Sequence, residues 1–216
     1  MKRFFLIFIL FLFACSDSSD DSSDISDPNN GSDGQLINLF FSEYAEGSSN
    51  NKYVEIYNPS SSSVNLSNYQ IKGTNNGTTW GDNGERELSL TGTLASNSVY
   101  IISTDAADQS ILNQADLSLP YESPLHYNGN DAIGIFGKDS SGSFTVVLDV
   151  IGVESYQGTA AWSVAGVSEA TKDHTLVRKL SINKGNSNWE NSSGTSTSNS
   201  EWEVKDIDDW TSLGSR

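Results

Sequence analysis

From residue 36 onward, apolar and polar positions alternate in short runs that are separated by clusters of Gly, Asn, Ser and Asp. A period of two indicates β-strands with one buried face. At 53–57 the alternation is clean and places Val54 and Ile56 on one face. No long stretch has helical spacing, although residues 106–118 favour one short helix. Strands are predicted at 36–44, 53–57, 64–66, 69–71, 87–90, 99–103, 132–136, 144–153 and 174–180. Short strands at this spacing predict an all-β sandwich.

The N-terminus departs from this pattern. Lys2 and Arg3 precede a wholly apolar run at 4–13, and small Ala14 is followed by Cys15. This order is typical of a secretory signal, and the run is too short for a bilayer, which needs about 20 helical residues. Residues 12–15 (Leu-Phe-Ala-Cys) resemble a bacterial lipobox, in which the cysteine is lipidated after cleavage before it. We therefore predict a signal peptide at 1–14 and a lipid anchor on Cys15; the alternatives are a plain signal peptide with an incidental cysteine, or a false signal.

Residues 15–35 form the predicted link between anchor and domain. They consist mainly of Ser and Asp and have almost no apolar side chains, so we expect a disordered acidic tether. A coil of this length spans roughly 25 Å. Acidic residues behind a lipidated cysteine also resemble the export signal of some bacterial surface lipoproteins, which predicts an outer-membrane, surface-exposed protein. A simple spacer is the alternative.

Composition restricts the partners of the domain at 36–216. The formal charge is −16, and loss of residues 1–14 would leave 10 basic against 28 acidic residues, a charge of −18. Such acidity argues against nucleic acid, whose phosphates require Lys and Arg. Cys15 is the single cysteine, so the sequence predicts no intrachain disulfide. The length suits one core, with a C-terminal extension from about residue 155.

Several segments, together and in order, resemble bacterial lamin-tail-domain (LTD) proteins. They are 39–47 (LFFSEYAEG), 50–58 (NNKYVEIYN), 64–69 (VNLSNY), 128–133 (NGNDAI), 148–152 (LDVIG), 175–179 (TLVRK), 185–186, Trp189, 200–202 and 213–215. The resemblance implies an immunoglobulin-like β-sandwich of secreted and surface proteins. It implies no catalysis and no cofactor, and suggests a role in membrane association or protein contact.

The first two of these segments carry charged residues around a predicted hairpin. We expect Glu43, Glu46 and Glu55 to be surface charges, with Lys52 paired to Glu43 or Glu55. A ligand site at this end of the sandwich is the alternative interpretation.

Asp149 lies inside an apolar run at 146–151. A buried carboxylate needs a partner, and Arg178 is the first candidate for a structural ion pair. The alternative, from the period of two, is an Asp149 side chain on the solvent face.

Two groups of residues leave further functions open. Trp189, Trp202 and Trp210 are predicted to pin the Ser/Asn-rich tail to the sandwich, whereas a carbohydrate-binding or adhesive module would show coplanar exposed rings of Trp80, Trp162 and Trp202. A metal-assisted hydrolase would need carboxylates and histidines to converge in one cleft; the candidates are Asp82, Asp105, Asp131 and His126.

His174, beside Asp173, is expected to be a solvated edge residue, and the sequence contains no Gly-x-Ser-x-Gly elbow. The sequence thus predicts a non-catalytic, lipid-anchored cell-envelope module without a metal or cofactor. Its partners would be the membrane, through Cys15, and an unknown protein or glycan.

Overall fold

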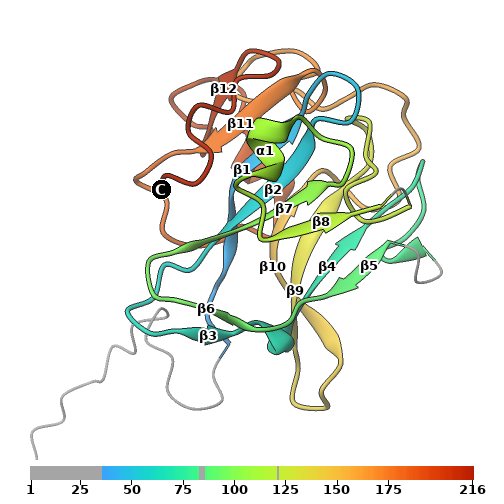
Figure 1. Cartoon of the computed structure of the whole chain (residues 1–216). Helices are drawn as coiled ribbons and strands as arrows, with labels where there is room; N and C mark the ends of the chain where they lie inside the picture. Colours follow the sequence, from blue (N-terminus) through green and yellow to red (C-terminus); the bar gives the residue numbers. More distant parts are fainter. Residues whose placement is uncertain (1–35, 83–85, 121) are drawn as a thin grey trace, which may run out of the picture.

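Two β-sheets face each other across the core, and a small two-stranded ribbon joins them at one end (Figure 1). The computed structural model describes residues 36–82, 86–120 and 122–216. The predicted signal peptide at 1–14, the lipidation site Cys15 and the tether at 15–35 lie outside the described residues.

The larger sheet has six strands in the order β12-β11-β1-β2-β7-β8. Neighbouring strands are antiparallel except β7 and β8, which are parallel. Strand bounds are β1 (Phe40–Glu46), β2 (Lys52–Tyr57), β7 (Val99–Thr104), β8 (Leu117–Leu119), β11 (His174–Arg178) and β12 (Trp202–Lys205).

The smaller sheet has four antiparallel strands in the order β10-β9-β4-β5, so β10 is an edge strand. Its bounds are β4 (Tyr69–Gly73), β5 (Glu87–Ser89), β9 (Ile133–Lys138) and β10 (Phe144–Ile151). The ribbon pairs β3 (Val64–Asn65) with β6 (Thr93–Leu94).

The main hydrophobic core lies between the sheets. Val54 and Ile56 of β2 are fully buried there with Ile71 of β4 and Ile135 of β9. This arrangement confirms the predicted all-β, immunoglobulin-like sandwich. It follows from the alternation, because residues with a period of two share one face of a strand.

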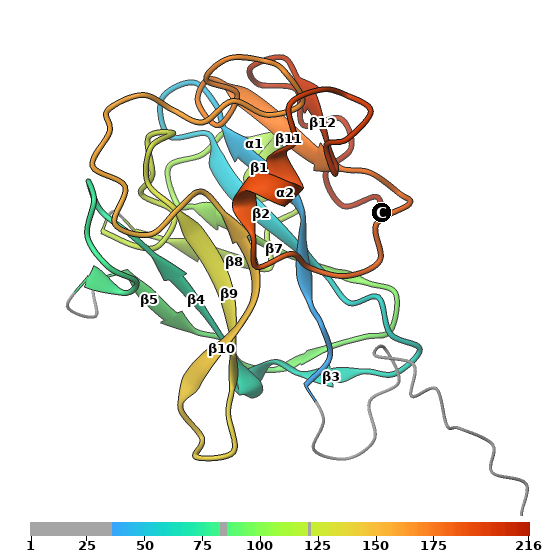
Figure 2. The same ribbon diagram turned by 180° about the vertical axis from the view of Figure 1, so that it is seen from behind.

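Short helices cover opposite faces of the six-stranded sheet. Figure 1 draws α1 (Gln109–Leu112) in front of this sheet, and Figure 2, turned by 180°, draws α2 (Trp189–Ser193) in front of it. Ile111 of α1 packs with Tyr53 of β2 in a second, smaller cluster on the outer face. Both faces of β2 are therefore covered, although its alternating sequence predicts only one buried face. A third, single-turn 3₁₀ helix, η1 (Leu66–Asn68), precedes β4.

The C-terminal part folds back onto the sandwich. Trp189 and Trp202 are buried in the main core, and Trp210 packs against the smaller cluster and donates its indole N–H to Ser110 Oγ at 2.9 Å. These contacts confirm that the tryptophans pin this part. Across the described ranges, the structure contains no helix with the length and apolarity that crossing a membrane requires.

Candidate functional site

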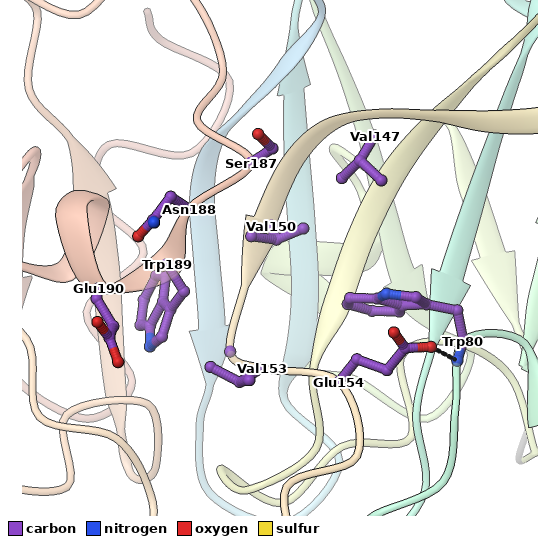
Figure 3. Close-up of a pocket in the computed structure, with 10 residues that line it drawn as sticks. Trp80, Val147, Val150, Val153, Glu154, Ser187, Asn188, Trp189 and Glu190 are labelled. Carbon is purple, nitrogen blue, oxygen red and sulfur yellow. Dashed lines mark hydrogen bonds between the residues drawn. The ribbon is translucent and has the colours of Figure 1, made fainter.

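An open groove of about 470 Å³ lies where edge strand β10 approaches the start of α2. Figure 3 shows Trp80 on one side of the groove and Trp189 on the other, with Val150 and Val153 between them. The groove is lined by Trp80, Val147, Val150, Gly152, Val153, Glu154, Ser187, Asn188, Trp189 and Glu190. It combines an apolar floor with polar groups at its margins.

Trp80 forms one wall and is held by two contacts. Its ring meets Phe136 of β9 edge to face, with 5.3 Å between centroids and an interplanar angle of 66°. Its backbone N–H donates to Glu154 Oε1 at 2.8 Å. The half-buried indole is thus fixed in orientation while part of it reaches the groove.

The opposite wall is the first turn of α2. Asn188 caps this helix, and its side-chain oxygen accepts a hydrogen bond from the Asn191 N–H at 3.0 Å. Trp189 then points into the core, where its ring centroid lies 6.5 Å from those of both Trp162 and Trp202. Because this anchor fixes the helix, the adjacent Glu190 carboxylate stays at the groove.

The floor comes from β10 and the turn that follows it. Val147 is 37% exposed and Val153 is 42% exposed, fractions that are high for large apolar side chains. Gly152 makes the turn possible, because its φ of 86° favours glycine and a Cβ there would lie 2.5 Å from the Trp162 ring. The valines thus remain accessible to a ligand.

The charge of the groove is negative. Glu154 and Glu190 contribute carboxylates, and none of the ten described lining residues is basic. Figure 3 places the Glu154 carboxylate beside the Trp80 ring and the Glu190 carboxylate beside Trp189. Ser187 and Asn188 add neutral polar groups. Such a surface favours ligands that donate hydrogen bonds or carry positive charge.

The structure brings Asp149 and Arg178 together, as the sequence analysis expected. Asp149 Oδ1 accepts a hydrogen bond from Arg178 Nη2 at 2.6 Å, and both side chains are completely buried. The solvent-face alternative is wrong for Asp149, because a register shift between Val147 and Asp149 changes which side chains turn inward.

Further contacts complete this ion pair. Asp149 also accepts backbone N–H groups from Phe41 and Asn186, each at 2.8 Å. Arg178 bonds Ser192 Oγ at 2.7 Å and lies 4.2 Å from the centroid of the Trp202 ring. Burial raises the pKa of Asp149, while Arg178 and the backbone donors oppose that rise. The pair connects β10 of one sheet to β11 of the other.

The expectation of surface charge around the first hairpin is wrong. Glu43, Glu46, Glu55 and Lys52 are all buried. Lys52 pairs with Glu46 rather than with Glu43 or Glu55, because Glu46 is its direct cross-strand partner. The cavity that Glu43 and Glu55 line with other described residues holds about 20 Å³, which is too small for a ligand.

The tryptophans do not form the flat platform that the carbohydrate hypothesis requires. Trp202 is fully buried, and Trp80 and Trp162 are half-buried. Trp162 meets Trp189 at 74°, and Trp189 meets Trp202 at 58°. The coplanar, exposed arrangement of Trp80, Trp162 and Trp202 that a carbohydrate-binding or adhesive module would show is therefore contradicted.

The residues named for a hydrolase come together only in part. His126 and Asp131 line one polar cleft of about 300 Å³, with Glu122 and Arg86, whereas Asp82 and Asp105 do not line it. Burial raises the pKa of Asp131 and lowers that of His126. Within the described ranges, no three His, Cys, Asp or Glu side chains are grouped so that they could hold a metal ion. The other histidine, His174, is partly buried at the start of β11.

Sequence reasoning missed the groove itself. Val147 and Val153 stand in a run interpreted wholly as strand, and Glu154 and Glu190 carry no recognisable motif. The sequence places two adjacent apolar residues, Val146 and Val147, in this run, and both are more than one-third exposed. Their meeting with α2, some 40 residues later, depends on the tertiary fold.

Fold and groove together define a β-sandwich module with an open, acidic, tryptophan-lined surface. The family model for the lamin tail domain matches residues 35–154, and the chain therefore belongs to the lamin tail domain family. The match ends at the groove residue Glu154, so the other wall of the groove comes from residues beyond it.

A solved structure supports the fold. The chain is similar to a DUF4876 family protein from Bacteroides thetaiotaomicron, with 14% identity, a TM-score of 0.50, and coverage of 80% of this chain and 72% of that one. At this identity the likeness concerns the fold alone. No curated protein matches the chain.

Proposed function

We propose that this protein is a non-catalytic binding module of the bacterial cell envelope, held at the membrane by a lipid on Cys15. Membership of the lamin tail domain family and the sandwich fold support a module of this kind. The groove between Trp80 and Trp189 is the surface that binds its partner.

The groove is the observation that carries the binding role. It has the size of a ligand site, which typically holds 300–1,000 Å³, and combines apolar area with a few polar groups. Val147, Val153 and part of Trp80 are apolar surfaces that stay in contact with water in the isolated domain. Leaving apolar area exposed costs about 25 cal/mol per Å², and a partner would remove this cost.

The anchor rests on the sequence. A lipobox-like Leu-Phe-Ala-Cys at 12–15 is followed by the acidic segment up to residue 35. Several acyl chains give stable membrane binding, since each buried CH₂ contributes about 0.8 kcal/mol. The proposed tether would carry the domain away from the membrane, and export to the outer surface of the outer membrane would present the groove to the exterior.

Two measurements test this proposal. Cys15→Ala should move the protein from the membrane fraction to the soluble fraction and remove its labelling by a fatty-acid analogue. Protease added to intact cells should degrade the wild-type domain if it is displayed outside. Retention of Cys15→Ala in membranes would refute the anchor.

The binding role has its own test. Wild-type protein and Trp80→Ala, each cross-linked on intact cells, are purified through an affinity tag and their adducts compared. Wild type should yield a defined adduct that Trp80→Ala loses, while Trp210→Phe, altered outside the groove, retains it. Identical adducts from wild type and Trp80→Ala would contradict binding at the groove.

A further inference from the structure

Given the binding role proposed above, we infer that the groove takes an extended protein segment that pairs with the edge of β10 and places a basic side chain between Trp80 and the carboxylates of Glu154 and Glu190. The strand edge, the fixed indole and the charge of the groove each point to one part of this ligand.

The strand edge favours an extended backbone. β10 ends the order of the four-stranded sheet, so no described strand pairs with its outer side. Asn186 covers only its second half, where its carbonyl accepts the Val150 N–H at 3.2 Å. Edge strands offer backbone groups that can pair with another chain, and peptides use such edges by strand addition.

The first half of β10 carries neither a lysine nor a proline against pairing, although a register shift lies between Phe144 and Val146. Natural edges are commonly guarded by lysine or proline, whereas 144–147 reads Phe-Thr-Val-Val. Val146 and Val147 are each 37% exposed, and Val153 nearby is 42% exposed. An added strand would cover these side chains, which accounts for apolar exposure that the isolated domain leaves open.

The charge of the groove selects the side chain that enters it. Glu154 and Glu190 are both exposed and line the same groove without a basic neighbour among its described residues. An anionic segment would meet two like charges there. A guanidinium or ammonium group would instead pair with a carboxylate in a charge-assisted hydrogen bond.

The indole adds selectivity for a planar cation. The Trp80 ring packs edge to face on Phe136, and the backbone N–H of Trp80 donates to Glu154, so the ring has little freedom to lose on binding. Arginine stacks on aromatic faces while its fork reaches a carboxylate. Trp80 and Glu154, joined by their hydrogen bond, offer both partners within one site.

A second copy of this chain fits the groove less well. The protein carries a formal charge of −16, so a second copy would bring further net negative charge to a groove that already holds Glu154 and Glu190. Repulsion between two such acidic copies opposes a dimer at this surface.

The test uses three labelled peptides that alternate valine and threonine and differ only at the central position. That position is arginine, the neutral isostere citrulline, or glutamate. Binding to the purified domain-containing chain is measured by fluorescence anisotropy. The arginine peptide should bind about tenfold more tightly than the citrulline peptide, the ratio that one charge-assisted hydrogen bond provides. The glutamate peptide should bind most weakly.

Protein variants locate the effect. Glu154→Gln and Glu190→Gln should each reduce the preference for arginine over citrulline while leaving citrulline binding unchanged. Glu169→Gln, altered at an exposed position outside the groove, should keep the preference. Raising the salt from about 50 mM to about 300 mM should weaken the arginine preference, because exposed charges are screened.

Backbone pairing is tested on the ligand, so folding of the protein is not at risk. N-methylation of alternate residues along one edge of the arginine peptide should abolish binding, whereas the same change along the other edge should be tolerated.

Equal affinity for the three peptides, or tolerance of methylation on both edges, overturns this inference. Dimerisation that competes with the peptides would also overturn it. The cross-linking comparison of wild type with Trp80→Ala decides the binding role separately.

Discussion

Glu43 of β1 lies directly opposite Glu55 of β2, and both side chains are buried, with 1% and 2% of their surface exposed. Like charges in such cross-strand positions destabilise a sheet when both are ionised. The pair persists because each carboxyl group has its own hydrogen-bond donors. Tyr53 and Ser212 donate to Glu43, and Ser42 and the Gly214 N–H donate to Glu55.

Two of these four donors come from the C-terminal segment at 212–216, which therefore closes over the carboxyl pair. Arg216 continues the cover: its guanidinium lies 4.9 Å from the centroid of the Phe40 ring and donates to the Arg178 carbonyl at 2.8 Å. Burial raises the pKa of Glu43 to about 7 and also raises that of Glu55. The packing of segment 212–216 over the pair is thus linked to the protonation of Glu43 and Glu55.

We predict that stability falls as the pH rises through the range in which Glu43 ionises. Its folded pKa of about 7 exceeds the ordinary value of 4.5, so the folded state holds the proton more tightly. This contribution is fully present below about pH 4.5 and is lost as pH rises toward 7, an effect of up to about 3 kcal/mol. The negative charges of Glu55 and Asp209 also raise the pKa of Glu43, and the Lys205 ammonium group faces Glu43 as a cation.

Urea unfolding of wild type and Glu43→Gln between about pH 5 and about pH 8 measures this effect. Glu43→Gln mimics the protonated carboxyl group and should flatten the pH dependence in that window. Glu169→Gln is the matched control and should retain the wild-type dependence. If the free energy of unfolding depends on pH in the same way in Glu43→Gln as in wild type, a group other than Glu43 causes the dependence.

Breaking the pair between Asp149 and Arg178 should be costly. Asp149→Ala removes the fully buried partner of the guanidinium and leaves Glu201, whose Oε2 lies 3.0 Å from Arg178 Nη1, as its remaining carboxylate. Breaking a buried pair costs about 3–5 kcal/mol, and we expect a loss near the lower end of that range. Equilibrium unfolding in denaturant checks this value. Lys205→Ala removes the exposed pair with Glu203 and should cost less than about 1 kcal/mol. A small effect of Asp149→Ala would show that the pair does not clamp the sheets.

The tryptophans should separate into structural and binding roles. Trp202→Ala removes a fully buried ring and should lower the free energy of unfolding by about 3–5 kcal/mol. Trp80→Ala removes a half-buried ring at the groove and should cost clearly less. Thermal unfolding monitored by circular dichroism compares the two variants. Equal losses would remove the justification for using Trp80→Ala as a binding probe.

The sequence predicts most long strands because their alternation is local. The sequence predicts the short strands β3 and β5 but not β6, β8 and β12. Two to four residues hold at most two periods of alternation, and such strands form through pairing with other parts of the chain. Asp149 illustrates a second limit. A period of two cannot decide its face, because bulges in β10 shift the register, and only the need of a buried charge for a partner pointed to Arg178.

The other predictions that are wrong fail because segments distant in the sequence bury the residues concerned. Glu43 and Glu55 stand at positions where alternation predicts solvent, but the residues that bury them follow about 160 positions later. The groove has the same origin, since Trp80 and Glu190 belong to separate parts of the chain and carry no common motif. Local patterns therefore predict the sheets better than they predict what covers them.

Site-specific photo-cross-linking in intact cells tests the central claim, that this groove is the binding surface of the module. A photoreactive phenylalanine analogue replaces Val153 in the groove or Leu180, which is 82% exposed and does not line the groove. The account predicts one defined adduct from position 153 that Trp80→Ala removes, and no such adduct from position 180. The same adduct from both positions, or one from position 153 that persists in Trp80→Ala, would contradict it.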